Sequence, residues 1–176
     1  MNEKRLWEGA QLQRMITHPV VKSTPKHTAI IKDLQEKGYS RTILKDTTIL
    51  KTIRDETEKL LKPEHAYDLA PPHFKCIRHP LVQCPTIIDL VTDDLMIGIA
   101  TEYLGCAPAL GTLNLRRSFI TDAVEDNTLL FHSDPNSIKF IKFFFYLNDV
   151  DIDGGPLTIV EGSIKDVGDR RGYLNG

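Results

Sequence analysis

The first part of the chain repeats apolar and polar residues with the period of a helix. Apolar side chains recur three or four positions apart among good helix formers, so they would share one helix face. Gly38 and Pro63 follow two of these segments and mark helix ends. The pattern predicts helices over residues 3–16, 28–37, 47–61 and 86–104.

The pattern changes after Gly105, where segments rich in β-branched, aromatic and leucine residues are separated by Asp, Asn and Gly clusters. Strands are therefore expected over residues 110–120, 129–131, 139–147 and 156–160. Between the two parts, prolines from Pro71 to Pro85 predict an irregular segment that wraps around the domain. Helices followed by short strands predict an α+β fold, with helices buttressing an antiparallel sheet or barrel.

The length and hydrophobic content of the chain indicate how many domains it forms. With 176 residues and 41% hydrophobic content, the chain is expected to form a single domain, 1–176. Residues 1–105 are its mainly helical lead-in, and residues 106–176 are its β part. The cysteines Cys76, Cys84 and Cys106 are odd in number and lack CxxC spacing, which predicts ordinary reduced or buried thiols.

Charge and hydropathy limit the kinds of partner that we expect for this chain. The 22 Lys and Arg residues balance 24 Asp and Glu residues without a long run of either sign, so no nucleic-acid or anionic-membrane partner is expected. No stretch approaches the roughly 20 apolar residues that span a membrane, and no signal-like segment follows the N-terminus. We expect a soluble, cytoplasmic protein whose partner is a small-molecule substrate.

The residues that indicate chemistry are His132 and Asp134. Side chains two positions apart in an extended chain point to the same side, so an imidazole nitrogen and a carboxylate oxygen can meet one metal ion. This donor pair suits iron(II), and one further histidine would complete a two-His, one-carboxylate triad with open positions for oxygen chemistry. An HxD tripeptide is weak evidence on its own, because such tripeptides also occur by chance.

The residues around HxD strengthen the prediction. A Lys-x-Phe-x-Tyr-Leu-type strand over 139–147, the acidic turn 149–153, Gly155-Pro156-Leu157 and the segment 161–165 follow it. This order resembles the phytanoyl-CoA dioxygenase family of Fe(II)/2-oxoglutarate-dependent oxygenases, over residues 110 to 165. The resemblance implies a double-stranded β-helix, which is a jelly-roll (cupin-like) barrel, and a dioxygenase that hydroxylates a small organic substrate.

The resemblance also implies roles for individual residues. His132 and Asp134 would be catalytic iron ligands, and 2-oxoglutarate would be the cosubstrate. Asn114 and Phe144 correspond to positions that line the cosubstrate pocket, although a one-residue slip in register would turn Phe144 outward. Arg116 is a candidate for binding an anionic group, whereas a solvated surface arginine is the simpler interpretation.

The sequence departs from the family in three ways. Glu161 stands where the family usually has Pro, and Ile164 stands where it has His, but neither position is a metal ligand there. More seriously, no histidine follows His132, so the distal iron-binding histidine and the arginine that grips 2-oxoglutarate are missing. We therefore expect the N-terminal portion of such an oxygenase, with the barrel incomplete at its C-terminus. The remaining histidines, which we expect to be ordinary surface or core residues, are His18, His27, His65, His73 and His79.

Two other interpretations remain open. The chain would be a catalytically inactive, truncated barrel that acts as a binding or interaction module. Alternatively, Asp149, Asp151, Asp153 and Gly154 match the first half of a calcium loop, but the twelfth position is Val160 instead of Glu. A hairpin turn accounts better for this acidic segment.

Overall fold

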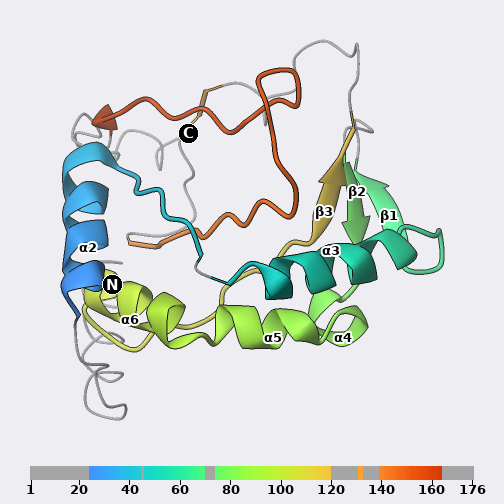
Figure 1. Ribbon diagram of the computed structural model, residues 1–176, viewed down its shortest axis with the longest axis horizontal. Coiled ribbons are helices and arrows are strands. Elements are labelled where there is room, and N and C mark those ends of the chain that lie inside the picture. Colours follow the sequence, from blue (N-terminus) through green and yellow to red (C-terminus); the bar gives the residue numbers. More distant parts are fainter. Residues whose placement is uncertain (1–23, 45, 70–73, 120–130, 133–138, 164–176) are drawn as a thin grey trace, which may run out of the picture.

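The computed structural model describes residues 24–44, 46–69, 74–119, 131–132 and 139–163 (Figure 1). Its helices are α2 (Pro25–Lys37), α3 (Thr48–Lys59), α4 (Pro80–Gln83), α5 (Thr86–Val91) and α6 (Asp94–Leu104). Its strands are β1 (Ala66–Leu69), β2 (Phe74–Ile77) and β3 (Arg116–Ser118). The helix predicted over residues 3–16 lies outside the described residues.

Helix α2 confirms the helix predicted over residues 28–37 and begins earlier, at Pro25. Thr24 caps it, because its side chain accepts a hydrogen bond from the backbone N–H of His27 while its own N–H donates to the His27 ring. Proline suits the first helical turn, where its missing N–H has no partner to lose. The helix ends at Gly38, whose φ of 87° is a left-handed conformation that glycine adopts without strain.

Helix α3 confirms the prediction over residues 47–61, but the helix predicted over residues 86–104 is wrong in one respect. It is two helices, α5 and α6, separated at Thr92 and Asp93. The Asp93 side chain accepts a hydrogen bond of 2.9 Å from the backbone N–H of Leu95, which caps a new helix. An apolar pattern continues across such a break, so periodicity alone missed it.

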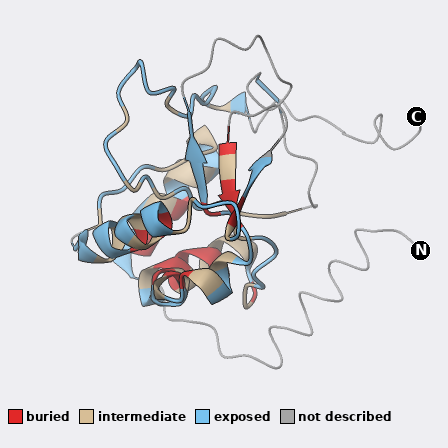
Figure 2. Ribbon diagram, turned by 90° about the vertical axis from the view of Figure 1, so that its right-hand side faces the viewer, coloured by how far each residue is buried: buried red, intermediate tan, exposed pale blue. Residues whose placement is uncertain are grey.

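The sheet is antiparallel, with the order β1-β2-β3. In its register Cys76 lies between Tyr67 and Arg116, and β2 is buried between the more exposed outer strands (Figure 2). Both β2 and α4 lie within the proline-rich segment 71–85, so the prediction that this segment is irregular is wrong for these residues. Pro80 is the first residue of α4, so proline here begins a helix instead of preventing regular structure.

The predicted strands of the β part are found only in small part. Of the described residues 110–119, only Arg116–Ser118 form a strand, and the described residues 139–163 form no strand. A strand requires a hydrogen-bonded neighbour, and segments 120–130 and 133–138 lie outside the described residues. The jelly-roll barrel therefore stays a prediction, whereas helices beside an antiparallel sheet are observed.

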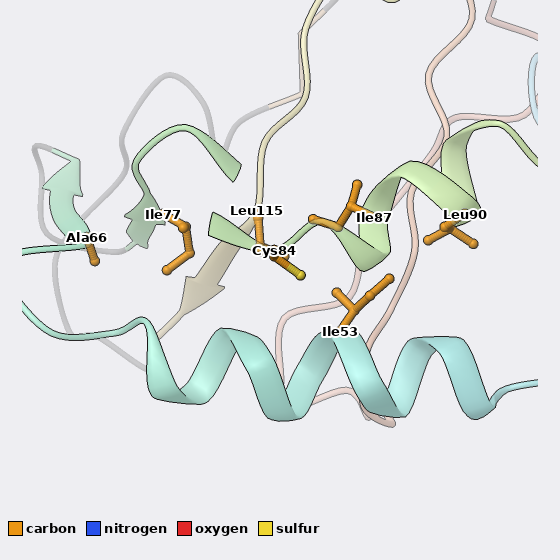
Figure 3. Close-up of a cluster of buried hydrophobic side chains, with 7 residues drawn as sticks. All are labelled: Ile53, Ala66, Ile77, Cys84, Ile87, Leu90 and Leu115. Carbon is orange, nitrogen blue, oxygen red and sulfur yellow. The ribbon is translucent and has the colours of Figure 1, made fainter. Parts of the chain in front are cut away.

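The hydrophobic core lies between α3, the sheet and α5 (Figure 3). Ile53 of α3 is 1% exposed and stands opposite Cys84 and Ile87. Phe145 and Leu147, far along the chain, pack against the same core, so residues 139–147 belong to this unit although they form no strand. The buried members of the cluster are Ile53, Ala66, Ile77, Cys84, Ile87, Leu90 and Leu115.

Helices α2 and α6 pack closely because Gly98 has no side chain. His27 is 4% exposed, and a Cβ built at Gly98 would lie 2.8 Å from its Nε2 atom. The imidazole that helps to cap α2 therefore also fills the space over Gly98.

Replacing this glycine tests the contact. We expect Gly98→Ala to lower the free energy of unfolding by about 1–3 kcal/mol, because the new methyl group forces the buried ring out of place. Urea unfolding would measure the change. Gly111→Ala is the matched control, since nothing lies within 4 Å of a Cβ at that position. Equal stability of the two variants would contradict the packing described.

Candidate functional site

The segment around β3 presents two different sides. Leu113 and Leu115 pack in the core, whereas Asn114 and Arg116 are exposed. The backbone N–H of Ile77 donates to the carbonyl of Leu115 at 2.9 Å, which holds this segment extended beside β2. Side chains alternate in an extended chain, so Asn114 and Arg116 share the side that points away from the helical core.

The last four residues of the segment 139–147 show the same alternation. Phe145 and Leu147 pack against the core, while Phe144 is 55% exposed and Tyr146 is 50% exposed. The ring of Phe143 stacks on that of Phe145, with 6.5 Å between the ring centroids. Of these neighbouring aromatic residues, Phe144 therefore points away from the core.

The adjacent arginines of β3 have opposite surroundings. The guanidinium of Arg116 lies over the ring of Phe74, with 4.3 Å from Cζ to the ring centroid. Arg117 instead donates to both carboxylate oxygens of Glu58 on α3. Arg117 therefore ties the sheet to a helix, and Arg116 is the arginine that remains accessible on the other face.

Of the two predicted iron ligands, His132 is described and exposed, while Asp134 lies outside the described residues. An imidazole nitrogen and a carboxylate oxygen are donors that iron(II) accepts, so the residue types fit the metal. Among the residues that the structure describes, no group of three or more His, Cys, Asp or Glu side chains that could hold a metal ion is found.

The other histidines have positions of their own. His27 is buried at the start of α2, and His65 precedes β1 in a turn. His79 is exposed before α4, with a φ of 47° that is uncommon for a residue with a side chain. His18 and His73 lie outside the described residues. For the three that are described, an ordinary role at the surface or in the core stays a prediction.

The acidic segment forms a turn beside the end of β3. The backbone N–H of Gly154 donates to the Oδ1 atom of Asp151 at 2.9 Å, and the hydroxyl of Tyr146 accepts from the N–H of Leu157 at 3.0 Å. An open cleft of about 370 Å³ lies between this turn and β3, lined by Ser118, Phe119, Asn148, Asp149, Val150, Asp151, Asp153, Gly154 and Gly155. The described flanks of the turn are not helices, in agreement with a turn instead of a helix-loop-helix calcium site.

A buried thiol lies on the helical side of the sheet. The Sγ atom of Cys84 donates to Glu56 at 2.9 Å, and the Thr86 hydroxyl donates to the other oxygen of the same carboxylate at 2.9 Å. Burial, together with the neighbouring carboxylate, raises the pKa of the Cys84 thiol to about 12. Cys84 therefore stays neutral and serves packing, and the free, buried state expected for all three cysteines is confirmed.

Sequence reasoning missed Arg78 as a candidate binding residue. Its guanidinium lies over the ring of Tyr67, 5.1 Å from the centroid, in the same manner as Arg116 over Phe74. The sequence does contain the aromatic Tyr67 and the cationic Arg78, which come together because β1 pairs with β2. This pair was hidden because the hairpin lies next to prolines and was not predicted.

Comparison with protein-family models, with curated proteins and with solved structures finds no match. Among the residues described, no helix has the length and apolar character needed to cross a lipid bilayer.

Titration of the buried thiol yields a prediction. The folded pKa of about 12 lies above the unfolded thiol value of about 8.5, so the stabilising effect is present below that lower pH and is lost as pH rises toward the folded value. Between about pH 8 and pH 10.5, the free energy of unfolding should fall more for the natural chain than for Cys84→Ser, which keeps a hydroxyl donor that does not titrate. Urea unfolding at both pH values measures this difference, and parallel losses would contradict it.

Proposed function

We propose that this chain belongs to an Fe(II)/2-oxoglutarate-dependent dioxygenase of the phytanoyl-CoA dioxygenase type that hydroxylates a small organic substrate. The main support from the sequence is the HxD motif at His132 and Asp134, with the strand, acidic turn and Gly-Pro-Leu that follow it. The main support from the structure is that Asn114, Arg116 and Phe144 all point away from the helical core.

The fact that these side chains point away from the helical core supports the proposal for a geometric reason. In a barrel buttressed by helices, one face of the sheet packs on the helices and the other faces the interior, where a ligand is held. Here α3 and α5 cover the face that carries Ala66 and Ile77. Asn114 and Arg116 belong to the opposite face, which is the face that would line the pocket.

Each residue then has a defined task. His132 and Asp134 would supply a nitrogen and an oxygen ligand to iron, and the bound iron with 2-oxoglutarate would supply the oxygen activation needed for hydroxylation. Arg116 would pair with a carboxylate of the cosubstrate, because a guanidinium donates two parallel hydrogen bonds to such a group. Asn114 would orient the cosubstrate through its amide, and Phe144 would form an apolar wall that excludes water.

The number of ligands limits what the chain does alone. No histidine follows His132, so the sequence offers no counterpart of the distal ligand where the family has it. We propose that the chain alone binds Fe(II) weakly and turns over little 2-oxoglutarate, because two ligands hold the ion poorly. A cytoplasmic location is part of the same proposal.

The second candidate is an inactive barrel that serves as a binding or interaction module. It would follow if the tripeptide at 132–134, a pattern that also occurs by chance, holds no metal. The two functions differ in whether His132 and Asp134 bind iron at all, so metal binding separates them.

Substitution of the proposed ligands tests the function. We expect His132→Ala and Asp134→Ala each to weaken Fe(II) binding at least about tenfold, since each removes a donor from an already incomplete set. Binding is measured without oxygen, by competition with a coloured iron chelator. His65→Ala is the control, because it removes an imidazole away from the motif. If His132→Ala and Asp134→Ala bind iron as tightly as the natural chain does, the ligand assignment is wrong and the inactive binding module is favoured.

A further inference from the structure

The cationic side chains on the two faces of the three-stranded sheet have different partners. On the face toward α3, Lys75 lies 3.6 Å from the carboxylate of Asp68, and Arg117 is paired with Glu58. Both cations on this face are therefore compensated by carboxylates of the same chain.

The opposite face carries Arg78 and Arg116, and both are exposed. Their guanidinium groups lie over Tyr67 and Phe74 respectively. Within the part of the chain that the structure describes, neither guanidinium has a carboxylate partner. The charge on this face is therefore available to an external anion.

The strand register holds these arginines near each other. Arg116 of β3 is opposite Cys76 of β2, and Arg78 follows Cys76 by two residues, directly after the end of β2. The backbone N–H of Arg78 donates to the carbonyl of His65 at 2.7 Å, which extends the pairing of β1 with β2 to this residue. Diagonal neighbours on adjacent antiparallel strands are about 7–8 Å apart and point to the same side, so the two side chains leave one face at about that separation.

We propose that this face, defined by Tyr67, Phe74, Arg78 and Arg116, binds a small molecule that carries a diphosphate group. We call it the arginine face. A ring under a guanidinium occupies the flat side of the group and leaves its N–H edge directed outward. Two such edges, already held in place, match the several oxygens of a diphosphate, to which each arginine can donate two hydrogen bonds.

Two neighbouring features add to the site. Phe74 is 8% exposed, so the ring beneath Arg116 is fixed by the fold and the guanidinium has a rigid support. Ser118 pairs with Phe74 across the strands, which places its hydroxyl on the arginine face as a further hydrogen-bond donor.

The inference goes beyond the proposed function and requires no iron. The proposed function assigns Arg116 to 2-oxoglutarate, so the two anions are rivals for that residue. A variant without His132 would lose the iron site and keep the arginine face, and the failure of one proposal is therefore distinguishable from the failure of the other.

The test uses the full chain without metal, with inorganic pyrophosphate as the probe in isothermal titration calorimetry at low ionic strength. We expect Arg78→Gln and Arg116→Gln each to weaken binding at least about tenfold, through the loss of charge-assisted hydrogen bonds. Arg116→Lys should weaken it as well, because an ammonium keeps the charge but lacks the planar fork.

The matched control is Arg117→Gln, which removes the same charge one residue away but on the helical face, where Glu58 already pairs with it. It should leave pyrophosphate binding within about twofold of the natural chain. Equal weakening by Arg117→Gln and Arg116→Gln would overturn the proposal, because attraction would then depend on overall charge alone. Binding of 2-oxoglutarate that is tighter than that of pyrophosphate, and lost with Arg116→Gln, would also overturn it in favour of the cosubstrate.

Discussion

The packing of α3 against one face of the sheet is the contact on which the rest of this structure depends. Ile53 is 1% exposed and belongs to one buried cluster with Ala66 and Ile77 of the sheet and Ile87 of α5. Removing this apolar surface from water contributes most of the driving force available to so small a core. The same contact gives the sheet one face toward α3 and one face away from it, and this distinction decides the role proposed for Asn114, Arg116 and Arg117.

Charge is distributed according to these two faces. Where the sheet meets α3, cations are neutralised, since a buried or half-buried charge without a partner is costly. On the face away from α3, Arg78 and Arg116 are exposed to water, and aromatic rings position their guanidinium groups without neutralising them. Arg116 and Arg117, adjacent in the sequence, therefore have different chemistry: one ties a strand to a helix, and the other is free to meet a ligand.

The two proposals place a ligand on the same side of the sheet and share Arg116, but they rest on different observations. The oxygenase proposal depends on His132 and Asp134 and takes its remaining residues from a family resemblance. The arginine face depends on contacts between described residues of β1, β2 and β3. Both place their ligand on the side of the sheet away from the helices, where polar groups reach solvent while their backbones stay anchored by the ladder and the core.

The sequence by itself determined the helices and the pattern of alternation. Helix formation is local, so the spacing of apolar residues and the stop at Gly38 were enough to predict α2 and α3. The break at Asp93 was not predicted because a cap competes with a continuous apolar pattern. The strands β1 and β2 were missed because each has four residues and pairs with a segment that only folding brings near.

For the candidate site, the sequence named Asn114, Arg116 and Phe144, and alternation required that Arg116 and Arg117 point to opposite sides. It did not say which arginine would face the helices, because that depends on where α3 packs. Nor did it reveal the partnership of Arg78 with Tyr67. Only the tertiary structure decided these points, since pairing across strands and packing of helices on a sheet join residues whose distance along the chain carries no signal of contact.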